Sequence, residues 1–216
     1  MNKIKVIIAD DEKLIRQGLR IILETYDDIE IAGEAENGEE AFELCTKKDV
    51  DIVLMDVRMP ICDGVEGTKL IKSKFKNIKV LFLTTFNDKE YIYDAINYGA
   101  SGYLLKDSDY ETIYEGIKAV YKGNVVIHPD AIGNIVRDAK DENEYYNSDL
   151  KKYNLSEKEI NIIKEIASGL SNKEIGEKLY LTEGTIKNNV SMILSKLNLR
   201  DRTQIVIFAF KNGIAK

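Results

Sequence analysis

Short apolar runs alternate with longer amphipathic stretches over the first 122 residues of the chain. The runs have the length of buried strands, and the stretches between them carry apolar residues at helical spacing. We therefore predict strands over 5–9, 29–35, 51–55, 79–84 and 101–105, and helices over 12–26, 38–48, 64–75, 88–98 and 109–122. Strands that alternate with helices in this way predict a doubly wound α/β fold around a five-stranded parallel sheet. The first, third and fourth runs are almost purely apolar, which favours central positions, whereas glutamates in the second favour an edge.

The pattern changes in the last third of the chain. Residues 136–154 are polar and charged without periodicity, which predicts a linker. Residues 155–213 are helical by pattern and carry several helix-start signals. These signals are Ser156 with Glu159, Ser171 with Glu174, Thr182, and Asp201 with Gln204. Two short helices followed by a longer one predict a separate, small all-α domain with helix-turn-helix geometry.

The long C-terminal helix has one apolar face and one polar face. Its apolar stripe consists of Ile186, Val190, Ile193, Leu194 and Leu197. Lys187, Asn188 and Ser191 therefore point away from the stripe, with Gly184 beside them near the start of the helix. An exposed face with a lysine, an asparagine and small residues suits the major groove of DNA. By pattern alone, a solvated face of a small helical bundle fits equally well.

Composition and charge separate the two halves further. The 216 residues are 44% hydrophobic and 31% charged, as expected for a globular protein. Residues 1–125 hold 17 basic and 24 acidic side chains, whereas residues 151–216 hold 12 basic and 7 acidic ones. A basic tail on an acidic body predicts a polyanionic partner for the tail only.

The remaining bulk features concern location and thiols. No apolar run is long enough to span a bilayer, and the N-terminus lacks the features of a signal peptide, so we expect a cytoplasmic protein without a membrane partner. Two cysteines do not make a disulfide framework. We expect Cys45 in the core and Cys62, in a loop after Met-Pro, to be exposed.

Polar residues that could take part in chemistry lie at the ends of the predicted strands. Asp10 and Asp11 follow the first strand, Asp56 the third, Thr84 and Thr85 the fourth, and Lys106 the fifth. Each has an ordinary explanation, such as helix capping for the acidic pair, a turn for threonine or a solvated strand exit for lysine. Their combination is more informative, because parallel strands bring their carboxyl ends to one edge, where ligands bind.

The chemistry of this set is that of phosphoryl transfer. Three close carboxylates repel one another and require a cation, and oxygen ligands suit Mg²⁺. Lys106 can neutralise Asp56 and later pair with a phosphoryl oxygen, to which Thr84 can also donate. A carboxylate such as Asp56 can itself act as a nucleophile and form an aspartyl-phosphate.

These residues resemble the signature of two-component receiver domains over residues 3 to about 122. The motifs are Asp10-Asp11, D-V-R-M-P-I-C-D-G at 56–64, Thr84 and G-Y-L-L-K at 102–106. The resemblance implies a flavodoxin-like sheet in the order 2-1-3-4-5. It also implies that a sensor histidine kinase phosphorylates Asp56, and that Mg²⁺ is held by Asp11, Asp56 and the Arg58 carbonyl, with Asp10 acting through water.

The resemblance further implies a conformational switch formed by Thr84 and Tyr103. The alternative for Tyr103 is an amphipathic strand residue with its hydroxyl in water. His128 is the only histidine and lies in a His-Pro turn, so we expect the kinase to supply the histidine for phosphotransfer.

The tail resembles the LuxR-type DNA-binding domain and, with the receiver, indicates the NarL/FixJ class of response regulators. The matching strings are L-S-x-x-E, G-x-S-N-K-E-I, T-x-x-T-I-K-x-x-V and K-L-x-L-x-x-R-T-Q. This resemblance implies that DNA is contacted by Lys187, Asn188, Ser191, Asn172, Lys173, Thr185, Lys196 and Arg202, the first two at base edges and the last five at or near phosphates. Asn189 replaces the usual histidine. Gly176 replaces the usual alanine and should cost roughly 0.5–1 kcal/mol of helix stability.

Three function classes fit parts of the sequence. A haloacid-dehalogenase-like phosphatase needs an acid two residues after its aspartate, where Arg58 stands, and no Walker-type phosphate loop is present. A constitutive DNA binder with a degenerate receiver would not need the acceptor-site side chains, all of which are intact. We therefore predict a transcription regulator and no enzyme activity beyond its own phosphorylation and dephosphorylation.

The predicted domains are a receiver over 1–125, a linker over 126–152 and a DNA-binding domain over 153–216. The resemblance to this class implies that phosphorylation promotes homodimerisation through helix 4, strand 5 and helix 5, and thereby binding to double-stranded promoter DNA.

Overall fold

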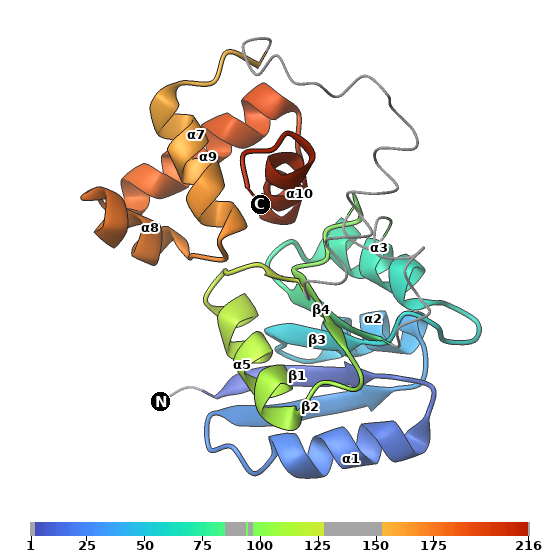
Figure 1. The fold of residues 1–216 in the computed structure, drawn as a ribbon. Coiled ribbons are helices and arrows are strands. Elements are labelled where there is room, and N and C mark those ends of the chain that lie inside the picture. The colour runs from blue at the N-terminus through green and yellow to red at the C-terminus, as the bar shows by residue number, and fades with distance from the viewer. Residues whose placement is uncertain (1–2, 85–93, 95–96, 128–152, 216) are drawn as a thin grey trace. The chain divides into compact units, whose positions relative to one another are not determined.

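The computed structural model of the chain describes residues 3–84, 94, 97–127 and 153–215 (Figure 1). The chain divides into two compact units, residues 1–121 and residues 122–216. We call them the N-terminal unit and the C-terminal unit. The predicted linker and His128 lie almost entirely outside the described residues, as does most of the helix predicted over 88–98.

The N-terminal unit is built on a parallel sheet. Its strands are β1 (Ile4–Ala9), β2 (Ile29–Ala35), β3 (Ile52–Met55), β4 (Lys79–Thr84) and β5 (Gly102–Leu105). Their order is β2-β1-β3-β4-β5, and all four pairings are parallel. A further strand of two residues, β6 (Val126–Ile127), falls among the residues of the C-terminal unit. The predicted order of the first five strands is therefore confirmed. The sequence did not predict β6, because two residues are too few to show a strand periodicity.

Helices cover both faces of the sheet. They are α1 (Lys13–Leu23), α2 (Gly38–Lys47), α3 (Gly64–Lys74) and α5 (Tyr110–Tyr121). In Figure 1, α1 and α5 lie on one face, and α2 and α3 lie on the other. Because the central strands are covered on both faces, all four residues of β3 are buried, while Glu30 on the edge strand β2 is exposed.

Glycine allows α2 and α3 to approach closely. A Cβ atom added at Gly67 would lie 2.6 Å from the Cα of Gly38, which is closer than such atoms can come. Both helices begin with a side-chain cap, in which Asn37 accepts from the Glu40 N–H and Asp63 from the Glu66 N–H. The caps and the glycine contact fix the loops that precede these helices, beside the carboxyl edge of the sheet.

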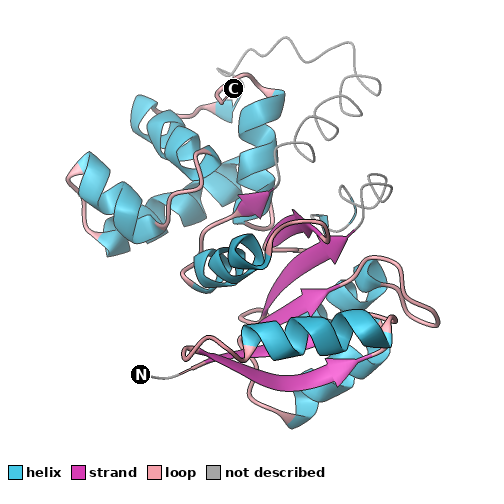
Figure 2. Cartoon of the chain, turned by 60° about the horizontal axis from the view of Figure 1, so that its bottom comes forward, coloured by secondary structure: helices cyan, strands magenta, loops and turns pink. Residues whose placement is uncertain are grey.

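In the described part of the C-terminal unit, four helices surround one apolar core; helices are cyan in Figure 2. They are α7 (Glu157–Ala167), α8 (Asn172–Leu179), α9 (Glu183–Leu197) and α10 (Arg202–Lys211). Both predicted capping boxes, at Ser156 and Ser171, are confirmed, as is the Thr182 cap. Asp201 caps α10, because its Oδ1 accepts a hydrogen bond from the Gln204 N–H at 3.0 Å, and the Gln204 side chain accepts one from the Arg200 N–H. None of the described helices is long and apolar enough to cross a membrane.

Candidate functional site

The strand-end carboxylates gather at one edge of the sheet. Asp10 follows β1 and Asp56 follows β3, and these two side chains are only 2% and 6% exposed. Asp11 is exposed, yet one carboxylate oxygen from each of the three residues lies within 4.8 Å of the others. The chain has to stabilise this concentration of negative charge, since burial removes the water that would otherwise solvate it.

Lys106, which follows β5, provides a first positive charge. Its Nζ lies 2.8 Å from Oδ2 of Asp10 and 2.9 Å from Oδ2 of Asp56. The structure therefore brings Lys106 and the two buried carboxylates together, as the strand-end argument predicts. Glu12, whose Oε1 is 4.0 Å from the same nitrogen, adds a weaker interaction at the surface.

Burial dominates the electrostatics of Asp56. It raises the pKa of this carboxyl group to about 6, although Lys106 acts in the opposite direction, and the nearby Asp10 adds to the increase. For Lys106, burial lowers the pKa, but the hydrogen bonds and charges of Asp10 and Asp56 outweigh it and leave the pKa raised. One ammonium group therefore does not fully neutralise the pocket, which still favours a further cation.

The acidic pair does not cap α1. The N-cap residue of α1 is Glu12, which makes no side-chain capping bond. Oδ1 of Asp10 accepts a hydrogen bond from the Glu12 N–H at 2.9 Å, so the carboxylate folds back on its own loop and keeps Oδ2 for Lys106. The ordinary capping explanation of this pair is therefore wrong for the helix start itself.

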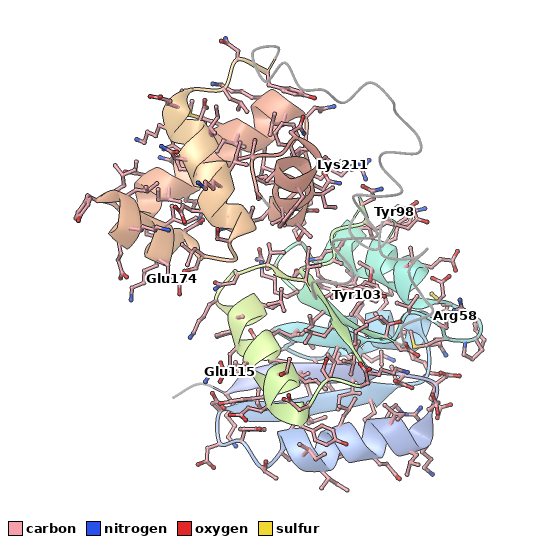
Figure 3. All side chains as sticks on the ribbon, viewed as in Figure 1. Arg58, Tyr98, Tyr103, Glu115, Glu174 and Lys211 are labelled. Atoms are coloured by element: carbon pink, nitrogen blue, oxygen red, sulfur yellow. The ribbon has the colours of Figure 1, made fainter. Side chains whose placement is uncertain are left out.

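The loop after β3 is tightly closed around Asp56. Its Oδ1 accepts the Val57 N–H at 2.8 Å, and the Gly64 N–H donates to the Val57 carbonyl at 2.8 Å. A Cβ atom added at Gly64 would lie only 2.0 Å from the Asp56 carbonyl oxygen, so only glycine fits at the start of α3. Arg58, labelled in Figure 3, is exposed in this loop.

Thr84 and Tyr103 are both buried near the same edge. Thr84 is the last residue of β4 and is 0% exposed, while Tyr103 in β5 is 2% exposed. The ring of Tyr103, labelled in Figure 3, packs on Phe82. The two ring centroids are 6.5 Å apart. The alternative in which the Tyr103 hydroxyl lies in water is therefore wrong for this structure. Thr85 lies outside the described residues.

The polar face predicted for α9 is exposed. Lys187, Asn188 and Ser191 are exposed, and Ile186, Val190, Ile193 and Leu197 are buried on the opposite face. Ser191 donates its hydroxyl to the Lys187 carbonyl at 3.1 Å, and Asn189 donates its amide to the Thr185 carbonyl at 2.7 Å. Lys187 and Asn188 thus remain the longest polar side chains on this face.

Two residues predicted at DNA phosphates have contacts inside the C-terminal unit. Arg202 donates to Oδ1 of Asn172 at 2.7 Å and to the Leu170 carbonyl, and burial lowers its pKa to about 10. Lys196 donates to Oε2 of the buried Glu159 at 2.8 Å. Sequence reasoning missed these interactions, because they join residues 30 and 37 positions apart that belong to no local motif.

Two smaller expectations need correction. Cys62 is buried, with only 7% of its surface exposed, and not accessible as expected. Its side chain occupies the space left by the missing side chain of Gly38, where an added Cβ atom would lie 2.9 Å from the Cys62 Sγ. The presence of glycine at position 176 also has a steric explanation. A Cβ atom there would lie 2.7 Å from the Leu181 carbonyl oxygen in the turn before α9. Helix propensity alone therefore misjudges the effect of alanine at this position.

Comparison with known proteins assigns both units. Residues 6–118 match the response regulator receiver domain, and residues 153–209 match the bacterial regulatory proteins of the luxR family. The chain is 45% identical over 217 residues to the transcriptional regulatory protein LnrK of Bacillus subtilis (strain 168), covering 98% of this chain and 99% of LnrK. It is 37% identical over 227 residues to the transcriptional regulatory protein DegU of Brevibacillus brevis, covering 100% and 96%.

Solved structures give the same picture. The crystal structure of the response regulator ChrA, from a heme-sensing two-component system, aligns with a TM-score of 0.54 and 28% identity over 99% of this chain and 100% of that one. Fold and site thus define a two-part regulator, with an acidic receiver pocket and a helix-turn-helix unit. The chain belongs to the two-component response regulators that combine a receiver domain with a LuxR-type DNA-binding domain.

Proposed function

We propose that phosphorylation of Asp56 by a sensor histidine kinase switches this transcription regulator between states of low and high affinity for promoter DNA. The observation that carries the proposal is the buried Asp56 carboxylate, which lies 2.9 Å from Lys106 and within reach of Asp10 and Asp11. Burying a charged carboxylate costs free energy. Carboxylates that a fold nevertheless buries beside specific charged partners are concentrated at functional sites.

The proposed step is an in-line phosphoryl transfer. A carboxylate oxygen of Asp56 attacks phosphorus, a C–O–P linkage forms, and the P–N bond to the kinase histidine breaks. The leaving imidazole keeps the bonding electron pair and takes a proton when it requires one. Lys106 moves from balancing the carboxylates to pairing with a phosphoryl oxygen, and the buried Thr84 hydroxyl lies at the neighbouring strand end to donate to the same group.

The donor set fits Mg²⁺. Three carboxylates within 4.8 Å of one another, two of them buried, provide hard oxygen ligands and an excess of negative charge. Asp11, Asp56 and the Arg58 carbonyl would hold the ion, with Asp10 acting through water. When bound, Mg²⁺ supplies charge neutralisation to the phosphoryl oxygens.

The output follows from a rearrangement around Thr84 and Tyr103. We propose that phosphorylation draws Thr84 toward the phosphoryl group and that the buried position of Tyr103 belongs to the active state. The face formed by β5, α5 and the helix predicted over 88–98, which lies mostly outside the described residues, would then become the dimer interface. Two C-terminal units would bind DNA half-sites about one helical turn apart.

DNA recognition is assigned to α9. Lys187 and Asn188 would reach base edges in the major groove, with Ser191 beside them, and Asn172, Lys173 and Thr185 would contact phosphates. Given their contacts with Asn172 and Glu159, Arg202 and Lys196 would act mainly by holding α8 and α9 in place. In domain terms we propose a receiver over 1–125, a linker over 126–152 and a DNA-binding domain over 153–216, working in the cytoplasm.

The test combines intact mass with size-exclusion chromatography. Wild type and Asp56→Asn are incubated with acetyl phosphate, with and without Mg²⁺. A phosphate-sized mass gain and earlier elution are expected only for wild type with Mg²⁺. Phosphorylation of Asp56→Asn to the same extent would place the acceptor elsewhere, and a mass gain without earlier elution would remove dimerisation from the mechanism.

A further inference from the structure

Arg16 is a buried arginine that touches the backbone of the acidic loop. It lies in the first turns of α1, and its side chain is 6% exposed. Nη1 donates to the Asp10 carbonyl at 2.6 Å and to the Asp11 carbonyl at 3.1 Å. One guanidinium group therefore holds the peptide groups of two consecutive residues whose side chains form the pocket.

The other side of the guanidinium is anchored to the next loop. Nη2 donates to Oε1 of Glu36 at 2.5 Å, and Nε lies 3.8 Å from Oε2 of Glu34. Glu36 is itself tied to the start of α2, because its N–H donates to Oε2 of Glu40 at 2.8 Å. The contacts thus run from the α2 N-terminus through Glu36 and Arg16 to the loop after β1.

We propose that Arg16 is a positioning residue for the divalent cation, one that presents the Asp10 and Asp11 carboxylates by fixing their main chain. Asp11 is exposed and makes no side-chain hydrogen bond among those found in the described residues, so its direction depends on its backbone. Groups that orient metal ligands without touching the metal typically change metal affinity 10- to 100-fold when removed. The inference rests on the proposed function, since it concerns the same pocket.

The charge of Arg16 and its positioning role predict opposite effects of its removal on the affinity for Mg²⁺. Arg16 carries a positive charge close to a site for a cation, so simple Coulomb repulsion makes its removal strengthen Mg²⁺ binding. Loss of the two carbonyl contacts makes its removal weaken binding instead. Lysine keeps the charge but replaces the planar fork, which here reaches three acceptors, with a single ammonium group.

The experiment is calorimetric titration of the unphosphorylated full chain with MgCl₂. The variants are Arg16→Met, Arg16→Lys and the matched control Arg20→Met. Arg20 lies one turn further along α1, also pairs with Glu34, at 2.9 Å, and has no hydrogen bond to the loop carbonyls among its described contacts. Thermal unfolding in EDTA measures the stability of each variant separately from its affinity for the metal.

The expected result is about tenfold weaker Mg²⁺ binding for Arg16→Met, a smaller loss for Arg16→Lys, and less than a twofold change for Arg20→Met. Unchanged binding in Arg16→Lys with unchanged or tighter binding in Arg16→Met would overturn the positioning role while leaving the proposed function intact. If Arg16→Met does not fold, Arg16→Lys against Arg20→Met decides the matter alone. A wild type that binds no Mg²⁺ would overturn both proposals.

Discussion

The fold holds the Asp56 carboxylate in an electrostatically unfavourable environment. Its pKa, raised to about 6, means that the folded protein binds a proton there more tightly than the unfolded chain does. The stability that this group contributes is complete below pH 4 and is lost as the pH rises through about 6. At neutral pH, the ionised carboxylate therefore works against folding.

We expect Asp56→Asn to be more stable than wild type at pH 7 in EDTA, by roughly 1–3 kcal/mol. The amide removes one buried charge while Lys106 keeps its contact with Asp10. Thermal or urea unfolding of both proteins measures the difference, which should shrink toward pH 4. Equal stability at pH 7 would show that Lys106 already compensates fully for the buried carboxylate.

In the C-terminal unit, Lys196 and the buried Glu159 form an ion pair. Glu159 is 3% exposed, and its capping bonds to Ser156 tie it to the start of α7. Burial alone would raise the pKa of Glu159, but Lys196 and Ser156 outweigh burial and lower it. This pair therefore contributes stability above the usual glutamate range, and the contribution is lost as the pH falls through the lowered pKa.

Lys196→Met should destabilise the C-terminal unit by about 1–2 kcal/mol at pH 7, since the lysine side chain is partly exposed and the full cost of a buried pair does not apply. Hydrogen exchange of α7 and α9 peptides in the full-length protein should report it. The difference from wild type should fade in acid. A variant that loses DNA affinity with unchanged exchange would instead make Lys196 a direct DNA contact.

Residue-level prediction from sequence succeeded where chemistry is carried by side chains at strand ends. Asp10, Asp56 and Lys106 meet because parallel strands share an edge, which the pattern already fixes. Arg16 was not predicted, because its role depends on backbone carbonyls that have no sequence signature. Cys62 was misplaced for a related reason, since its burial depends on a glycine in another element.

At the scale of elements, apolar periodicity located the strands and most helices to within one or two residues. Among the described helices the first is the exception, because α1 ends at Leu23 rather than at residue 26. Beyond Leu23, the N–H groups of Thr25 and Tyr26 donate to the carbonyls of Ile22 and Leu23, three residues back. No change of polarity marks that end, so the sequence could not place it. Helix propensity likewise could not predict how closely the turn between α8 and α9 packs against Gly176.

Gly176→Ala should destabilise the protein by about 1 kcal/mol despite the higher helix propensity of alanine, because the new methyl group meets the Leu181 carbonyl. Gly18→Ala in α1 is the control, since a Cβ atom there meets nothing within 4 Å. That variant should gain roughly 0.5–1 kcal/mol. Calorimetric unfolding compares the two, and stabilisation by Gly176→Ala would mean that the turn relaxes without cost.

Replacing Lys187 tests the recognition role of α9. Lys187→Met should cost about 1–3 kcal/mol of binding to a site selected from random DNA, and less on unselected DNA, so that specificity falls. The slope of log K against log salt concentration should change little, because that slope counts phosphate contacts and not base contacts. Lys158→Met, on the exposed start of α7, is the control and should stay near wild type. Fluorescence anisotropy gives both quantities, and equal losses on all sequences would make Lys187 a phosphate contact.

At the scale of the whole molecule, a change in charge and a change in pattern accompany the division into two units. The basic residues 151–216 lie in the C-terminal unit, whereas the acidic first 121 residues form the N-terminal one. The division of labour between the units could be predicted because each carries its own motif.

The strand order has a consequence for the newly made chain on the ribosome. The pocket combines residues that follow β1, β3 and β5, so its three parts are synthesised almost a hundred residues apart. A nascent chain that ends before Lys106 has the Asp56 carboxylate without its counter-charge. Under the proposed function, competence for phosphorylation therefore arises only when the last of these strands has joined the sheet.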